Sequence, residues 1–158
     1  MAFIVEDNEM FSTMLDHTLS NESVCRFVNF KSGEECINNL YMNPLMVILD
    51  YGLPGMDGLK TFRVMKKYNP EIPVVVLTGK NDEKVAREFF NEGAYAYLVK
   101  QKSTVPQIIK IINDLLYNGI GKKHTAKNDS NKKIYKNLAI ILLLVGLAMG
   151  MFYFLHSG

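Results

Sequence analysis

Short apolar runs that alternate with helical patterns constrain the fold of this chain more than any other feature. Five such runs occur in the first 118 residues, at 2–6, 24–28, 45–49, 72–77 and 94–99. Runs of this length, rich in β-branched residues, are typical of strands buried on both faces of a parallel sheet. The segments between them have apolar residues at helical spacing. We therefore expect one doubly wound α/β domain over residues 1–118.

Capping signals predict where the helices of this domain begin and end. Ser32 starts a capping box, Asp57 and Asp82 precede two further helical patterns, and Thr104 opens the fifth. Gly93 is a typical C-terminal stop for the fourth helix. Five strands and five helices in alternation favour the flavodoxin-like strand order 2-1-3-4-5, which places strands 1, 3 and 4 side by side.

Polar residues follow four of the predicted strands at the point where each strand ends. They are two carboxylates after strand 1, one after strand 3, a hydroxyl after strand 4 and an ammonium after strand 5, namely Glu6, Asp7, Asp50, Thr78 and Lys100. The C-terminal ends of parallel strands line one crevice, so we expect these side chains to converge. Carboxylates suit a hard cation such as Mg²⁺, and Lys and Thr suit phosphoryl oxygens. The pattern predicts a site where an aspartate meets a metal and a phosphoryl group.

These residues, in this order and at this scale, resemble the receiver domain of bacterial response regulators. The matching elements are Glu6-Asp7, Asp50, the segment LPGMDG at 53–58, Thr78-Gly79, and Tyr97 with Lys100. The resemblance implies that Asp50 is the phosphoacceptor and that the donor is a phosphohistidine. That phosphohistidine would belong to a sensor histidine kinase or a histidine phosphotransfer protein.

The resemblance also implies which residues would hold the metal. Asp7 and Asp50 would bind Mg²⁺ directly, Glu6 would usually bind it through water, and the backbone carbonyl of Gly52 would complete the protein ligands. Mg²⁺ at this position would relieve the repulsion between the neighbouring carboxylates and polarise an incoming phosphoryl group.

Three further residues would respond to the phosphoryl group by the same resemblance. Thr78 and Lys100 would contact its oxygens, and Tyr97 would be the aromatic residue whose inward or outward rotamer reports the state. One position departs from the family pattern, because Gln101 follows Lys100 where receivers usually carry Pro. A non-proline cis bond costs about 3 kcal/mol, so we expect the Lys100–Gln101 bond to be trans.

The C-terminal part of the chain has a different character. Residues 138–155 form an uncharged run of eighteen residues, LAIILLLVGLAMGMFYFL. As a helix this run would extend about 27 Å, which is close to the thickness of the hydrocarbon core of a bilayer. We expect a single-pass transmembrane tail anchor here, with the receiver domain on the cytoplasmic side of the inner (cytoplasmic) membrane. Within it, Gly146 and Gly150 have the GxxxG spacing of paired membrane helices, so a homodimer is a further hypothesis.

Residues 119–137 would then be a basic juxtamembrane linker. This segment contains six lysines and a single aspartate, although the net charge of the whole chain is only +2. Such a charge run next to an apolar helix favours contact with an anionic lipid surface. No DNA-reading motif follows the receiver pattern, so we expect no nucleic-acid partner.

Several alternatives remain open from the residues alone. The chain could be a constitutive adaptor in which the receiver fold only docks partners and Asp50 is rarely phosphorylated. A phospho-aspartate hydrolase would need an acid/base group two residues after the nucleophile, where this chain has Gly52. We therefore expect no enzymatic activity beyond self-phosphorylation and autodephosphorylation. Cys25 and Cys36 lack a metal-binding or disulfide spacing and are expected to be buried thiols.

Overall fold

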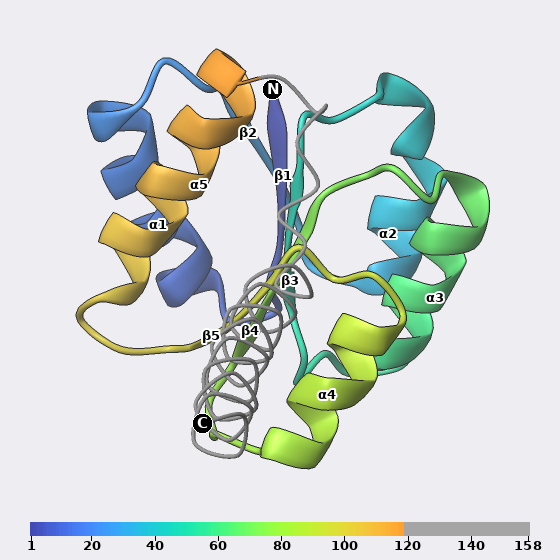
Figure 1. The fold of residues 1–158 in the computed structure, drawn as a ribbon. Helices are drawn as coiled ribbons and strands as arrows, with labels where there is room; N and C mark the ends of the chain where they lie inside the picture. Colours follow the sequence, from blue (N-terminus) through green and yellow to red (C-terminus); the bar gives the residue numbers. More distant parts are fainter. Residues whose placement is uncertain (119–158) are drawn as a thin grey trace, which may run out of the picture. The chain divides into compact units, whose positions relative to one another are not determined.

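The computed structural model describes residues 1–118, and these residues form an α/β domain around one parallel sheet. The strands are β1 (Ala2–Val5), β2 (Phe27–Phe30), β3 (Val47–Asp50), β4 (Val74–Thr78) and β5 (Ala96–Val99). All neighbouring strands are parallel, and their order is β2-β1-β3-β4-β5 (Figure 1). The predicted fold class and strand order are confirmed.

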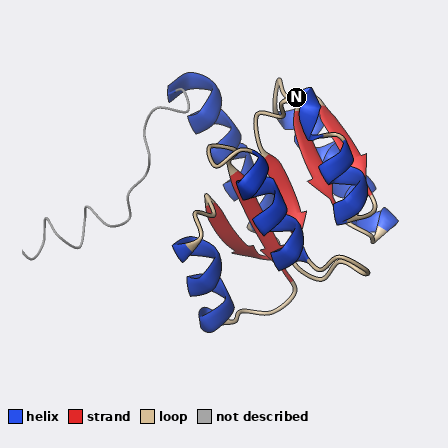
Figure 2. Cartoon of the chain, turned by 90° about the vertical axis from the view of Figure 1, so that its right-hand side faces the viewer, coloured by secondary structure: helices blue, strands red, loops and turns tan. Residues whose placement is uncertain are grey.

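Helices cover both faces of this sheet. They are α1 (Glu9–Glu22), α2 (Gly33–Asn38), α3 (Gly58–Tyr68), α4 (Glu83–Asn91) and α5 (Thr104–Asn118), with a short 3₁₀ turn η1 (Leu40–Met42) after α2. α1 and α5 lie together on one side of the sheet, and α2, α3 and α4 lie on the other (Figure 1). Figure 2 shows the same layers from a second direction.

The two helical layers bury two separate hydrophobic clusters, one on each face of the sheet. Alternate residues of the central strands point to opposite faces, so Phe3 and Val5 belong to one cluster, whereas Ala2 and Ile4 belong to the other. Every residue of β1, β3 and β4 is buried. Burial on both faces explains why these strands appear in the sequence as continuous apolar runs.

Most of the predicted helix caps are confirmed. Asp57 accepts a hydrogen bond from the Lys60 N–H at 2.8 Å, and Asp82 caps α4 in the same way. Gly93 has a φ of 92°, as expected of a glycine that ends a helix. The capping box at Ser32 forms only in part, because Glu35 accepts from the N–H of Lys31 instead of that of Ser32.

Some boundaries differ from those predicted. β2 begins at Phe27 and not at Val24, because its partner β1 begins at Ala2, which pairs with Phe27. Val24 has no strand to pair with and is exposed. The apolar residues Ile37 and Leu40 after Ser32 predict a helix that continues through Leu40, but α2 ends at Asn38 and Leu40 starts the 3₁₀ turn instead.

The predictions for the C-terminal segments lie outside the described residues. These are the basic linker at 119–137, the tail anchor at 138–155 and the glycine pair Gly146 and Gly150. Among residues 1–118, no helix is both long enough and apolar enough to cross a bilayer.

Candidate functional site

Three carboxylates gather at the C-terminal edge of the sheet. Glu6 and Asp7 follow β1, Asp50 ends β3, and one oxygen from each lies within 4.8 Å of the others. Glu6 and Asp50 are buried, whereas Asp7 is exposed. Neighbouring parallel strands end at the same level, so the β1–β3 pairing brings these residues together as the sequence predicted.

Lys100 supplies the positive charge of this cluster. Its ammonium lies 2.6 Å from Glu6 Oε2 and 3.1 Å from Asp50 Oδ1, and only 21% of its side chain is exposed. The same ammonium lies 4.7 Å from the centre of the Phe11 ring, which is a cation–π distance. Lys100 therefore sits between two carboxylates and an aromatic ring from α1.

The backbone on both sides of Lys100 is held by one hydroxyl group. Thr104 Oγ1 donates to the Val99 carbonyl at 2.8 Å and accepts from the Gln101 N–H at 2.9 Å. The peptide bonds of residues 1–118 are all trans, so the prediction for Lys100–Gln101 is confirmed. Gln101 has the N–H that a proline would lack, and Thr104 uses it to fix the turn.

Thr78 lies at the end of β4, as predicted, and its side chain is buried. Its hydroxyl donates to the Lys80 carbonyl at 3.0 Å and accepts from the Lys80 N–H at 3.2 Å. The hydroxyl is therefore bonded within its own loop in this state. To contact a phosphoryl oxygen, the Thr78 hydroxyl would have to give up its hydrogen bonds to the Lys80 backbone.

Tyr97 points into the domain. Its ring packs against Phe89 at 5.9 Å between ring centres and contacts the cluster beneath α2, α3 and α4. Within residues 1–118, the Tyr97 hydroxyl is the buried polar side-chain atom that has no hydrogen-bond partner. A buried hydroxyl without a partner costs free energy.

Two glycines shape the loop that follows Asp50. A Cβ atom at Gly58 would lie 2.6 Å from the Asp50 carbonyl oxygen, so only glycine lets the start of α3 approach β3 this closely. A Cβ atom at Gly52 would lie 3.5 Å from Asp50 Oδ2, which is ordinary contact. Glycine at position 52 therefore places no side-chain atom against the Asp50 carboxylate.

The carboxylate cluster fits a divalent cation. Burial raises the pKa of Glu6, the ion pair with Lys100 opposes this, and the nearby charge of Asp50 raises it further. Removing the positive charge of Lys100 without replacing it would leave buried carboxylates facing one another. A hard cation with oxygen ligands would compensate the same charges.

Two residues that matter to this geometry were not predicted from the sequence. Phe11 lies at helical spacing with Met14 and Leu15, a pattern that predicts only the apolar face of a helix. Thr104 was predicted only to open a helix. The local sequence pattern does not identify either residue as part of the site. Phe11 contacts Lys100, which is distant in the sequence, and the hydrogen bonds of Thr104 depend on the shape of the turn after β5. Cys25 and Cys36, in contrast, are buried free thiols as predicted.

Comparison with known proteins agrees with this geometry. The family model described as "Response regulator receiver domain" matches residues 2–113. The regulator NtrC of Klebsiella pneumoniae, described as a DNA-binding transcriptional regulator, is 31% identical over 101 residues. That match covers 63% of this chain, which spans only about a fifth (21%) of the length of NtrC.

Two further relatives match a similar share of this chain. YesN of Bacillus subtilis, an uncharacterized transcriptional regulatory protein, is 27% identical over 124 residues, which is 76% of this chain and 34% of YesN. A receiver domain structure from Clostridium thermocellum has a TM-score of 0.67 at 24% identity and covers 74% of this chain and 94% of its own. The family model covers most of the chain, and the chain therefore belongs to the response regulator receiver domain family of two-component signalling.

Proposed function

We propose that Asp50 accepts a phosphoryl group from a phosphohistidine and that the chain signals through the resulting change in its surface. The observation that carries this proposal is the placement of Lys100 between Glu6 and Asp50 at the open edge of the sheet. An ion pair that served only stability would not need a third carboxylate in a cluster that a metal ion could bind.

The chemistry follows from the groups present. A carboxylate oxygen of Asp50 attacks phosphorus, the O–P bond forms, the P–N bond breaks, and the electron pair returns to the imidazole of the donor. Mg²⁺ bound by Glu6, Asp7 and Asp50 would polarise the phosphoryl group. Lys100 then compensates the added negative charge, and Thr78 can exchange its bonds to Lys80 for a phosphoryl oxygen.

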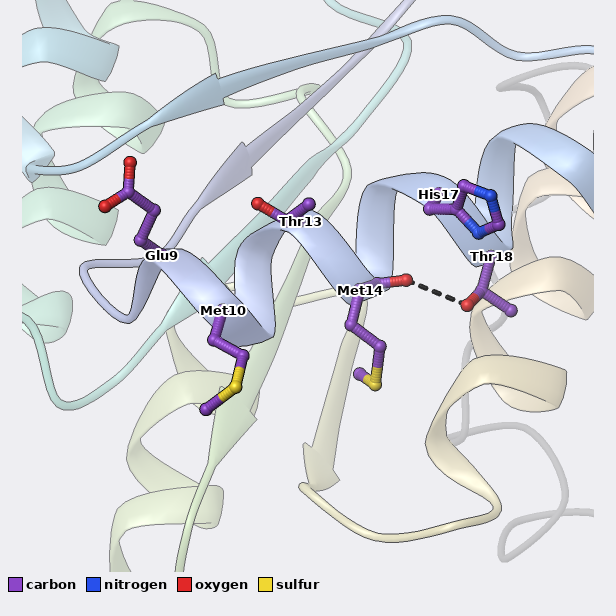
Figure 3. A pocket seen from close by; sticks show the side chains of 6 residues that line it. All are labelled: Glu9, Met10, Thr13, Met14, His17 and Thr18. Carbon is purple, nitrogen blue, oxygen red and sulfur yellow. Dashed lines mark hydrogen bonds between the residues drawn. The ribbon is translucent and has the colours of Figure 1, made fainter.

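The surface of α1 next to the crevice suits a protein phosphodonor. α1 begins two residues after Asp7, and its exposed methionines Met10 and Met14 are 81% and 47% accessible. They line a shallow pocket on α1 together with Glu9, Thr13, His17 and Thr18 (Figure 3). Methionine packs adaptably against apolar partners, so we propose that a helix of the donor rests on this surface.

Phosphorylation with a small donor tests the proposal directly. The full chain in detergent, incubated with Mg²⁺ and phosphoramidate, should gain the mass of one phosphoryl group, and hydroxylamine should remove it. Asp50→Asn should abolish the gain, and Asp7→Asn should weaken the dependence on Mg²⁺. Asp57→Asn is the matched control, because Asp57 caps α3 and forms an exposed ion pair with Lys60, and asparagine caps equally well. A wild-type chain without mass gain at saturating donor would favour the constitutive adaptor.

We also propose that residues 138–155 tether the receiver domain to the cytoplasmic membrane. The support is the uncharged eighteen-residue run and the six lysines of residues 119–137. A helix that spans the bilayer is held essentially irreversibly, whereas a basic segment alone is released by salt. Tethering would raise the effective concentration of the receiver near membrane-bound kinases.

Cell fractionation distinguishes a spanning anchor from a basic surface patch. The full chain should remain in the membrane pellet through high salt and alkaline carbonate, and a 1–133 truncation should be soluble. Release of the full chain by salt would contradict a spanning helix and show that the lysines of residues 119–137 alone bind the membrane. If the anchor spans, Gly146→Ile and Gly150→Ile test whether the helices pair, since isoleucine blocks close approach at a GxxxG face.

A further inference from the structure

The ring of Phe11 contacts the Lys100 ammonium in addition to the two carboxylates. Glu6 and Asp50 contact the ammonium at 2.6 and 3.1 Å, and the centre of the Phe11 ring lies 4.7 Å away. The ring faces of aromatic side chains carry partial negative charge, so the contact is attractive and needs no formal charge.

The position of this ring is fixed by its own element. Phe11 lies in the first turn of α1, and its N–H donates to the cap residue Asn8 at 3.0 Å. Its side chain is half-buried and packs on the cluster shared with α1 and α5. The ring is therefore held by the helix start and by packing, and not by Lys100 itself.

We propose that Phe11 is a positioning residue for Lys100. Its aromatic ring keeps the ammonium at the site when the carboxylates bind a metal ion. This inference rests on the proposed phosphoryl transfer. A cation bound by Glu6 and Asp50 would compete with Lys100 for these carboxylates and weaken its ion pairs. The contact with the Phe11 ring does not depend on the carboxylates, so it can hold Lys100 within reach of an incoming phosphoryl oxygen.

Substitution of Phe11 separates this role from simple packing. Phe11→Leu keeps an apolar side chain but removes the ring, and Phe11→Tyr and Phe11→Trp keep an aromatic face. A partly buried cation–π contact corresponds to about a two- to tenfold change in rate if it is lost at the transition state. The rate of phosphorylation of the full chain in detergent by phosphoramidate should fall by this factor in Phe11→Leu and recover in the two aromatic variants. Phe27→Leu is the matched control, since Phe27 is a half-buried phenylalanine of the same cluster.

NMR spectroscopy tests the contact between the Phe11 ring and Lys100 without phosphorylation. In the metal-free full chain with ¹³C-labelled lysine, the ε-methylene signal of Lys100 should be shifted upfield by the ring and assigned by its loss in Lys100→Met. Phe11→Leu should remove the shift, and Phe27→Leu should not. An unshifted signal in the wild type, or equal rates for the wild type and Phe11→Leu, would overturn the role of Phe11. A wild-type chain that takes up no phosphoryl group would instead overturn the proposed function, and the lysine spectrum would still report on the Phe11 contact.

Discussion

The Thr104 hydroxyl is the most informative single group to remove from this domain. Thr104 is only 2% exposed, and its hydroxyl joins the Val99 carbonyl to the Gln101 N–H on either side of Lys100. Valine has nearly the same shape and no hydroxyl, so Thr104→Val removes two hydrogen bonds and leaves the packing almost unchanged.

The loss of stability in Thr104→Val depends on how deeply the Val99 carbonyl and the Gln101 N–H are buried. A net hydrogen bond contributes about 0.5–1.5 kcal/mol, and a buried group left unpaired costs more than one that water can reach. Gln101 is exposed, so water can satisfy its N–H, whereas Val99 is half-buried. We expect a loss of about 1–2 kcal/mol in the free energy of unfolding. For a domain of this size that corresponds to a melting temperature lower by roughly 4–8 °C.

Thermal unfolding of a 1–121 fragment, followed by circular dichroism, measures this effect. Thr104→Ser keeps the hydroxyl and should recover most of the lost stability. The sharper test repeats Thr104→Val in a Gln101→Pro background, where no N–H remains to be lost. The cost should then be smaller by about one hydrogen bond, or ~1 kcal/mol. An equal cost in both backgrounds, or no cost in the first, would refute the assignment of Thr104 as the group that fixes this turn.

Two other predictions concern titration and the buried tyrosine. Burial raises the pKa of Glu6, so its favourable contribution to folding is present below pH about 4.5 and is lost as the pH rises through the raised pKa in the metal-free protein. Mg²⁺ affinity measured by calorimetry should therefore fall as the pH is lowered through the raised pKa of Glu6, and an affinity that does not change on acidification would contradict the shift. Tyr97→Phe removes the unpaired hydroxyl and should stabilise the domain by about 1 kcal/mol in thermal unfolding, whereas a lower melting temperature would show that the hydroxyl has a partner.

The sequence predicted the sheet and the polar residues of the site, for an identifiable physical reason. Strands buried on both faces must be apolar throughout, so a charged residue at the end of such a strand stands out, as Asp50 does at the end of β3. Lys100 stands out in the same way after the apolar run of the edge strand β5. Parallel pairing then brings the strand ends together whatever the connecting segments contain. The positions of these residues therefore follow from the order of the strands alone.

The boundaries and the orientation of side chains could not be predicted in this way. The start of β2 depends on where β1 begins to offer partners, which is a property of the pair and not of either run. The direction of Tyr97 and the two hydrogen bonds of Thr78 depend on rotamers that a single sequence does not record. Phe11 and Thr104 reach Lys100 only through the packing of α1 and the turn before α5.

If Asp50 accepts a phosphoryl group as proposed, these contacts would give Lys100 two roles that depend on the state of the site. Without a metal, its ammonium compensates the charges of Glu6 and Asp50 and reduces the repulsion between the two buried carboxylates. A metal bound by the same carboxylates would take over that role and free the ammonium for the negative charge of a phosphoryl group. Metal binding and phosphoryl recognition would then be coupled through one side chain. Such coupling would require the freed ammonium to stay close to the site. The Phe11 ring contacts the ammonium, and the Thr104 hydroxyl holds the backbone on either side of Lys100, and neither contact depends on the carboxylates.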